Sequence, residues 1–340
     1  MILDGHLPAS IEDAARALRS GALLGLPTET VYGLAADADN DAAVAQIFAA
    51  KGRPSDHPLI VHVADASAIA HFASAVPVFA QALVDAFWPG PLTLILPRRP
   101  KMARAATGGQ DSVGLRCPAH PVAHAVLHAC AQDDPALGGA PVWGVAAPSA
   151  NRFGRVSPTT AAHVQAELGD ALLVLDGGPC AVGIESTIVD CTRGLPVLLR
   201  PGAITRAQIE SACGLRLLSK EELPAHTPRA SGTLLSHYAP NAKVRLMDAR
   251  ALQAGLDVLG QDAAHLAVYA RTPLRIAKGA HGVQLRRMPD NAQATAAELF
   301  AVLRELGDTG AHLHWIETPP DTPDWEGVRD RLQRAAAAAA

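Results

Sequence analysis

The sequence is poor in aromatic and charged residues, and it has no long apolar run. Aromatic residues make up 4% of its 340 residues and charged residues 18%, whereas hydrophobic residues reach 49%. This composition differs from that of disordered chains, and the length favours two domains that each bury a core. No stretch approaches the run of about 18 apolar residues that a membrane-spanning helix needs. We therefore expect a folded protein that does not span a membrane.

The five cysteines are far apart in the sequence, and none forms a CxxC pair. Zinc and redox motifs usually place two cysteines close together, so this spacing predicts reduced thiols. The first residues, MILDGHLPAS, lack the basic and apolar segments of a secretory signal. Together these observations predict a cytoplasmic protein.

Positive charge is not in excess. Lys and Arg number 29 against 33 for Asp and Glu, which gives a formal net charge of −4. A surface that coats nucleic acid or anionic lipid needs an excess of cations, so that class of protein is excluded. The signatures GxxxxGKS/T, GxGxxG, HExxH and GxSxG are also absent. Any nucleotide site must therefore use a different, local set of side chains.

Helical and strand-like patterns alternate from residue 1 to about residue 215. The apolar spacing predicts helices over 11–19, 42–51, 78–87, 122–131 and 159–168. We expect the first to be capped by Ser10, and the last to start behind Ser157 as N-cap and Pro158 as the first helical residue. Short apolar runs predict buried strands at 22–26, 59–63, 92–96, 142–146 and 172–175. The sequence thus predicts an α/β sheet with covering helices.

Residues 219–241 lose this periodicity and gather Pro, Ser and Gly, as linkers do. We therefore predict a catalytic domain over 1–218, a linker or lid over 219–241, and a small α/β domain over 242–340. The predicted strands of the last domain are 244–247, 266–269 and 313–316, and its predicted helices are 249–259, 293–306 and 324–335.

Two segments place polar groups where they can hold a ligand. PTETVYGL, residues 27–34, puts hydroxyls, a carboxylate and a phenol on the turn after the first strand, although an ordinary strand-to-helix loop is an equal alternative. Lys51 and Arg53 of KGRP can neutralise a polyphosphate, because one is a point charge and the other a planar fork. The alternative is a pair of cations that complement a helix C-terminus. We expect Lys51→Ala or Arg53→Ala to lower turnover while the fold survives, since removing an exposed cation costs little stability.

Further polar clusters follow at the ends of predicted strands: SVGLR at 112–116, APSAN at 147–151, GIESTI at 183–188 and LLRPG at 198–202. Ligands of open α/β sheets bind outside the carboxyl ends of strands, so these clusters can converge on one cleft. Solvated arginines and simple turns are the alternative. His120, His124 and His128 repeat every fourth residue, but no Cys or Glu nearby completes a metal site, and a half-solvated helix face is favoured.

The order of these motifs, with WPGPLT at 88–93 and SPT at 157–159, resembles the YrdC-like L-threonylcarbamoyladenylate (threonylcarbamoyl-AMP) synthases from about residue 10 to 213. SHYAP at 236–240 and WIETP at 315–319 are similar to the long, two-domain form of that family. The resemblance implies a YrdC-like open twisted mixed sheet with covering helices and a large concave pocket. It also implies a smaller Rossmann-like α/β domain at the C-terminus.

The resemblance further implies a nucleotidyltransferase that joins L-threonine, bicarbonate or carbon dioxide, and ATP into threonylcarbamoyl-AMP and pyrophosphate. Mg²⁺ would be held mainly by the ATP, with no ligand from protein side chains. The product would pass to the machinery that makes threonylcarbamoyladenosine at position 37 of ANN-decoding tRNAs, with at most weak binding of tRNA by this protein and none to membranes.

The residues of the family's motifs then suggest individual roles. Lys51 and Arg53 would be catalytic, and Arg116 would clamp the amino-acid carboxylate. His237 and Tyr238 would approach the nucleotide as part of a lid that excludes water. The implied ATP-binding residues are Arg53, His57, Ser112, Ser149, Ser157, Arg200, His237 and Tyr238. The implied threonine-binding residues are Thr30, His62, Arg116, Ala147 and Ser186.

Two other readings stay open at this stage. A non-catalytic RNA-binding YrdC-like module is disfavoured by the net charge and by the lack of Lys/Arg runs. The carbamoyl-transfer domain of hydrogenase-maturation proteins is accompanied by zinc-finger segments, for which this chain lacks the CxxC pairs.

Overall fold

Strands and helices alternate along the chain in a computed structural model that describes residues 1–222, 230, 232, 237–278 and 282–338. Contacts divide the chain into two units, one of residues 1–153 and 157–233 and the other of residues 154–156 and 234–340. The division falls inside the predicted linker 219–241, most of which lies outside the described residues. Residues 154–156 join the second unit because Ala239 pairs with them, its N–H donating to Gly154 O at 2.8 Å.

The first unit is built on a mixed sheet, which contains both parallel and antiparallel pairs of strands. Its order is β1-β8-β2-β3-β7-β4-β6-β5-β9-β10-β11. The strands are β1 Ile2–Asp4, β2 Leu24–Leu26, β3 Gly33–Asp37, β4 Ile60–His62, β5 Leu92–Pro97, β6 Ser112–Arg116, β7 Val145–Ala146, β8 Leu173–Asp176, β9 Thr187–Asp190, β10 Val197–Arg200 and β11 Leu218–Ser219. The predicted α/β class with a mixed sheet is confirmed.

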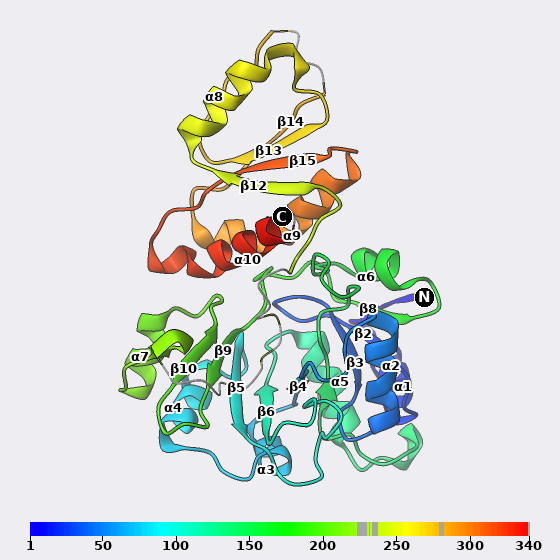
Figure 1. The fold of residues 1–340 in the computed structure, drawn as a ribbon. Helices are drawn as coiled ribbons and strands as arrows, with labels where there is room; N and C mark the ends of the chain where they lie inside the picture. Colours follow the sequence, from blue (N-terminus) through cyan, green and yellow to red (C-terminus); the bar gives the residue numbers. More distant parts are fainter. Residues whose placement is uncertain (223–229, 231, 233–236, 279–281, 339–340) are drawn as a thin grey trace. The chain divides into compact units, whose positions relative to one another are not determined.

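Seven α-helices accompany these strands among the described residues of the unit. They are α1 Pro8–Arg19, α2 Asp41–Lys51, α3 Ile69–Phe72, α4 Val78–Phe87, α5 Pro121–Ala131, α6 Ala161–Leu168 and α7 Arg206–Cys213. Short 3-10 helices lie at Ala66–Ala68, Pro135–Leu137 and Lys220–Glu222. Figure 1 shows α1 and α2 beside β2 and β3, and α4 and α7 beside β5, β9 and β10.

Alternate residues of the strands face two separate apolar clusters. Leu24 and Leu26 of β2 and Val145 of β7 pack with α1 and α5, whereas Leu34 of β3 and Ala146 of β7 pack with α2. This alternation follows from the period of two in a strand, and it explains why the buried runs are apolar on both faces.

On one part of the sheet, the described helices cover a single face. Leu94 of β5 and Val189 of β9 belong to the large core with α4, but Ile95 and Ile188 point to the other side. There they form a small cluster with Val197 and Leu199. The partly buried residues Ile60, Leu218 and Ala230 pack against this cluster, and no helix contributes to it among the described residues. This half of the sheet therefore presents an apolar floor.

Three local expectations are wrong. Helix α1 has Leu7 as its N-cap, with Pro8 at the first turn and no side-chain cap, so Ser10 lies inside the helix. Helix α6 begins after Thr160, whose hydroxyl accepts the His163 N–H, because the Ser157 hydroxyl is engaged by a carboxylate elsewhere. The PTETVYGL segment connects a strand to a strand rather than to a helix, since β3 pairs antiparallel with β2.

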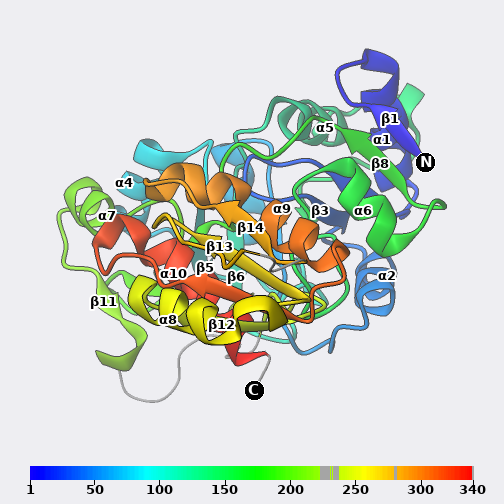
Figure 2. The same cartoon turned by 90° about the horizontal axis from the view of Figure 1, so that it is seen from above.

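The second unit contains a parallel sheet of order β12-β15-β13-β14. Its elements are β12 Lys243–Met247, α8 Ala249–Leu259, β13 Leu266–Ala270, β14 Gln284–Arg287, α9 Ala292–Asp308, β15 Leu313–Glu317 and α10 Glu326–Ala337, with 3-10 turns at Gly260–Asp262 and Pro323–Trp325. Figures 1 and 2 show α8 on one face of this sheet and α9 and α10 on the other. The predicted small α/β domain is confirmed as a parallel, doubly covered sheet.

Over the part of the chain that the structure describes, none of the helices combines the length and the apolar character needed to cross a bilayer.

Candidate functional site

Arg116 ends β6 and is buried, with 3% of its surface exposed. Its Nη1 donates to the Thr30 hydroxyl at 2.7 Å, and its Nε donates to Gly90 O at 3.2 Å. Its Nη2 lies 2.6 Å from Glu29 Oε1. Two of the predicted threonine-binding residues, Thr30 and Arg116, are thus brought together from segments 86 residues apart. Protein groups contact all three guanidinium nitrogens. The expected bidentate contact with the substrate carboxylate can therefore use only the N–H groups that remain.

His62 ends β4 and is the register partner of Arg116 on the parallel strand β6. Burial and then the neighbouring Arg116 charge lower the pKa of His62 to about 3. The ring is therefore neutral near pH 7, and it serves as a hydrogen-bonding group rather than a cation. Ala147 follows β7 and donates its N–H to Ile60 O at 3.0 Å, which places it across β4 from the same region.

Lys51 is the last residue of α2, and Gly52 ends the helix in the left-handed conformation at φ 61°. The Lys51 ammonium donates to the carbonyl oxygen of Ser149 at 2.5 Å and also to that of Asn151. Burial, and then repulsion by Arg53, lower the pKa of Lys51 to about 7. The expectation that these cations are exposed is wrong, because only 3% of the Lys51 surface and 9% of the Arg53 surface are accessible.

Arg53 and His57 gather around one aromatic ring. The Arg53 guanidinium lies over Phe153 at 5.8 Å from the ring centroid, and its Nη2 donates to Pro58 O at 2.9 Å. The His57 ring lies 5.5 Å from the same Phe153 ring. Phe153 in turn donates its N–H to Lys51 O at 2.8 Å, so the KGRP segment and residues 149–153 form one cationic corner.

A second hydroxyl and guanidinium network lies at the start of β9. Arg200 donates from Nε to Ser186 O at 3.0 Å and from Nη2 to the Ser186 hydroxyl at 3.1 Å. The Ser186 hydroxyl also lies 2.7 Å from the Thr93 hydroxyl of β5. Next to it, Ser157 donates to Glu185 Oε1 at 2.5 Å. Ser186 and Arg200, predicted for different substrates, are therefore direct neighbours.

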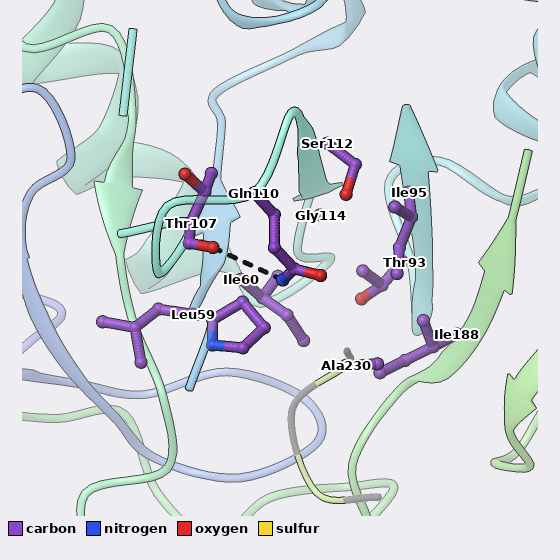
Figure 3. Close-up of a pocket in the computed structure, with 11 residues that line it drawn as sticks. Leu59, Ile60, Thr93, Ile95, Thr107, Gln110, Ser112, Gly114, Ile188 and Ala230 are labelled. Carbon is purple, nitrogen blue, oxygen red and sulfur yellow. Dashed lines mark hydrogen bonds between the residues drawn. The ribbon is translucent and has the colours of Figure 1, made fainter. Parts of the chain in front are cut away.

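A shallow hollow lies over the apolar floor of the sheet. Figure 3 shows Ile60, Ile95, Ile188 and Ala230 at this hollow, with the polar side chains of Thr93 and Ser112 beside them. The remaining lining residues are Pro58, Leu59, Thr107, Gln110 and Gly114. An apolar floor with several hydroxyl groups beside it is a combination that ligand sites often show.

Ser112 and Arg116 do not lie together. They are the first and last residues of β6, so about 13 Å of extended strand separates them. Ser112 belongs to the hollow, and Arg116 to the contact with Thr30. The predicted residues thus form a row of contacts along the sheet, linked through Thr93, which both lines the hollow and touches Ser186.

His237 and Tyr238 belong to the second unit and are buried within it. The Tyr238 ring lies 5.2 Å from the Phe300 ring of α9 and 5.7 Å from the guanidinium carbon of Arg331 of α10. His237 donates its N–H to Arg334 O at 3.3 Å. The neighbouring part of the predicted lid, 223–229, 231 and 233–236, lies outside the described residues.

Three participants were missing from the sequence prediction: Glu29, Thr93 and Glu185. Each stands inside a quoted motif, PTETVYGL, WPGPLT or GIESTI, so the motifs contained them. Their partners Arg116, Ser186 and Ser157 are distant in sequence, and no local pattern reports such a pairing.

No group of three or more His, Cys, Asp or Glu side chains is placed to hold a metal ion in the described part of the chain. His120 accepts the Val122 N–H as the cap of α5, and the His124 and His128 rings contact each other at 4.5 Å. The five cysteines are free, and burial raises the pKa of Cys117 to about 11, so this thiol stays protonated near pH 7.

Comparison with known proteins finds two matching families. The model Sua5_yciO_yrdC, described as "Telomere recombination", matches residues 16–202. The model Sua5_C, described as "Threonylcarbamoyl-AMP synthase, C-terminal domain", matches residues 204–337. The two matches together span nearly the whole chain.

Named relatives are similar over nearly their full length. A Bacillus subtilis protein named threonylcarbamoyl-AMP synthase is 37% identical over 331 residues, which cover 96% of this chain and 92% of the relative. A Pyrococcus abyssi protein of the same name is 35% identical over 342 residues, with 96% and 93% covered. The crystal structure of Pyrococcus abyssi Sua5 complexed with L-threonine matches with a TM-score of 0.85 at 33% identity, covering 97% of this chain and 94% of that one.

Proposed function

This chain belongs to the threonylcarbamoyl-AMP synthase family, and on that premise we propose that it is a nucleotidyltransferase. It joins L-threonine, bicarbonate or carbon dioxide, and ATP into threonylcarbamoyl-AMP and pyrophosphate. The observation that carries the proposal is the near full-length similarity to relatives named for this activity. The product is then used, in the cytoplasm, by the machinery that modifies adenosine 37 of ANN-decoding tRNAs.

The cationic corner and the Ser186 network support binding of ATP. Lys51 and Arg53 supply positive charge for the phosphates, and Arg200 supplies a guanidinium next to Ser186. The Ser149 hydroxyl adds a donor, and His57 contributes a ring beside Phe153. Ser157 donates its one O–H to Glu185, so it would offer ATP only the acceptor side of its hydroxyl. The apolar floor of Ile60, Ile95 and Ile188, with Ser112 at its side, suits the flat face of the nucleobase.

The proposed chemistry has two stages. The threonine amine first forms a carbamate with the one-carbon substrate, and a carbamate oxygen then displaces pyrophosphate from the α-phosphate. Mg²⁺ bound with the ATP would neutralise part of the phosphate charge. The chain's own contribution is orientation and positive charge at the reacting phosphate, for which no covalent nucleophile is required.

The proposed threonine site is lined by Thr30, His62, Arg116, Ala147 and Ser186. The neutral His62 ring and the Thr30 and Ser186 hydroxyls offer hydrogen bonds, while Arg116 offers the cation for the carboxylate. Threonine differs from serine by one methyl group, which is worth about 1 kcal/mol in an apolar contact. We therefore expect serine to be accepted at a lower rate.

His237 and Tyr238 act in this proposal as part of a lid over the nucleotide. A mixed anhydride is lost when water reaches it, so a cover protects the product. Within the second unit, Tyr238 rests on Phe300 and Arg331, which offers the lid a fixed base. The expected result of Tyr238→Ala is lower turnover together with faster hydrolysis of the product.

The direct test is a product assay by mass spectrometry. The purified full chain is incubated with L-threonine, bicarbonate, ATP and Mg²⁺, and each component is omitted in turn. We expect threonylcarbamoyl-AMP and pyrophosphate only in the complete mixture, and turnover lowered in Lys51→Ala and Arg53→Ala. Salt-sensitive retention of tRNA without any threonine-dependent use of ATP would instead identify an RNA-binding module.

A further inference from the structure

Three consecutive residues are held by the second unit, although their neighbours on both sides belong to the first. Contacts place residues 154–156 in the second unit and the residues that flank them in the first. The Ala239 N–H donates to Gly154 O at 2.8 Å, and Arg304 of α9 donates from Nη2 to Val156 O. We call residues 154–156 the strap, because the second unit grips them at both ends.

The strap continues directly into two parts of the proposed ATP site. On its N-terminal side, Phe153 donates its N–H to Lys51 O at 2.8 Å and lies under the Arg53 guanidinium. On its C-terminal side, Ser157 is fully buried and donates to Glu185 Oε1 at 2.5 Å. Three residues span at most about 11 Å, so a strap that changes its path must pull on one or both of these neighbours.

The chain on either side of the strap is anchored within the first unit. The Lys51 ammonium donates to the carbonyl oxygens of Ser149 and Asn151 before the strap. After the strap, the Tyr32 N–H donates to Pro158 O at 2.9 Å. The strap is therefore a short span between two fixed points, and its middle is where the second unit can act on it.

Helix α9 supports both the strap and the proposed lid. Phe300 packs on the Tyr238 ring at 5.2 Å, and Arg304, which holds the strap, lies one helical turn further along. Residues four apart in a helix lie on the same face. Ala239, which bonds to the strap, directly follows Tyr238. One face of α9 thus fixes the lid segment and the strap together.

We propose that Arg304 is a positioning residue for ATP binding, which acts by holding the strap. Val156 is 3% exposed, and a buried carbonyl oxygen that loses its donor is costly. Without Arg304 the strap must therefore rearrange, and Ser157 and Phe153 leave the positions in which they face the nucleotide. This inference rests on the proposed function, and it gives the second unit a task in binding a nucleoside triphosphate besides carrying the lid.

The test measures the affinity of the full chain for two ligands by calorimetry. One is α,β-methylene-ATP, in which a CH₂ group replaces the bridging oxygen that the proposed reaction would break, and the other is L-threonine. Arg304→Met removes the donor and keeps an apolar stem. We expect the Kd of the ATP analogue to rise at least about threefold, and the Kd of threonine to change less than about twofold.

Arg329→Met is the matched control, because Arg329 is also a half-buried arginine of the second unit that donates to backbone carbonyls. Its Nη1 donates to Thr322 O at 2.8 Å and to Pro320 O, neither of which belongs to the strap. This variant should bind the analogue as wild type does. A smaller loss in Arg304→Met, a similar loss in Arg329→Met, or an equal loss of threonine affinity would overturn the inference.

Gly154→Ala tests the strap from its other end, and it decides alone if Arg304→Met does not fold. Gly154 has a φ of 81°, so a side chain there strains the backbone, although its Cβ would meet nothing within 4 Å. Gly194→Ala makes the same change at a φ of 78°, also in open space, in the turn between β9 and β10. Only Gly154→Ala should weaken binding of the analogue by at least about threefold. Equal Kd values for the analogue in the two glycine variants would overturn the inference.

Failure of the proposed function has a different signature. A chain in which Arg304→Met selectively weakens the analogue, but which makes no threonylcarbamoyl-AMP, keeps the strap and loses the proposed reaction. A chain that makes the product, and whose Arg304→Met variant binds the analogue as wild type does, keeps the reaction and loses the role of Arg304.

Discussion

The ammonium of Lys51 donates a hydrogen bond to the carbonyl oxygen of Ser149 at 2.5 Å, across 98 residues of sequence. Its other acceptor, Asn151 O, is also an uncharged carbonyl. Burial dominates over the more distant charges of Glu167 and Glu185, and it lowers the pKa of Lys51 to about 7. The charge of this residue near neutral pH is therefore set by what binds next to it.

We predict that ATP affinity falls as the pH rises above 7. Free Lys51 loses its proton as the pH passes about 7, whereas Lys51 beside phosphate stays protonated to higher pH. Binding above pH 7 must then take up a proton, and each further pH unit weakens binding by up to about tenfold until the pKa of the bound state is reached. Calorimetry in two buffers of different ionisation enthalpy at pH 8 should detect about one proton taken up.

Lys51→Arg is the control for this pH dependence, because arginine stays charged over the whole range. Its ATP affinity should vary much less between pH 7 and 9. Equal heats in both buffers at pH 8 with the wild-type chain would contradict the assigned role of Lys51.

Replacing Thr93 by Val should impair the reaction more than it harms the fold. The Thr93 hydroxyl lies 2.7 Å from the Ser186 hydroxyl, and Arg200 donates to that same hydroxyl. Valine keeps the shape but leaves Ser186 without this partner, at a cost of about 1–2 kcal/mol in the free energy of unfolding. Chemical denaturation measures that cost, and steady-state kinetics should show a lower kcat/KM for threonine.

Thr295→Val provides the comparison for Thr93. Thr295 is fully buried in the second unit, and its hydroxyl donates to Pro289 O at 3.2 Å. Its loss should cost a similar free energy of unfolding without changing kcat/KM. Equal kcat/KM values for the two variants would show that Thr93 does not contribute to the site.

Gly202→Ala should disrupt the start of β9. A Cβ at this position would lie 2.5 Å from Thr187 N, 2.7 Å from Thr187 Oγ1 and 2.9 Å from Glu185 O, which are closer than real side-chain contacts. Residues 185–187 must then shift, and Ser186 shifts with them. We expect a loss of about 1–3 kcal/mol in the free energy of unfolding and a large loss of turnover.

Gly307→Ala makes the contrasting change. Gly307 lies inside α9, and a Cβ there would meet Asn241 N at 3.9 Å and Asn241 Cβ at 4.0 Å, which are ordinary contact distances. This substitution should raise the free energy of unfolding by about 0.5–1 kcal/mol. A Gly202→Ala protein with wild-type stability and turnover would show that the close approach is not needed.

Phe300→Ala should loosen the segment that contains Tyr238. Phe300 is fully buried and contacts the Tyr238 ring at 5.2 Å. Truncating a buried Phe costs about 3–5 kcal/mol, and thermal unfolding should report it as a lower Tm. If Tyr238 works in a lid, turnover also falls at temperatures where the variant is still folded.

Val258→Ala serves as the reference for Phe300, since Val258 of α8 is 87% exposed. It should change neither the Tm nor turnover. Unchanged turnover in a folded Phe300→Ala protein would show that the packing of Tyr238 in the second unit does not affect the reaction.

Helix α4 and helix α8 show how well local pattern predicts local structure. Both have the predicted bounds, 78–87 and 249–259, because each has apolar residues at helical spacing between clear start and stop signals. The predicted start of helix α6 was wrong. The Ser157 hydroxyl, which was expected to cap the helix, donates to Glu185 instead. A distant partner overrode a local signal there.

The sequence by itself determined the alternation of strands and helices, the second small domain and the identity of the polar residues. Each of these follows from residue type and from spacing over a few residues. Only the tertiary structure decided that Lys51 is buried under carbonyl oxygens, that Glu29 faces Arg116, and that Ser112 lies at the opposite end of β6 from Arg116. The physical reason is strand order. Neighbours in the sheet are chosen by the packing of whole strands and helices, so contacts between residues about 90 to 100 apart in sequence have no local signature.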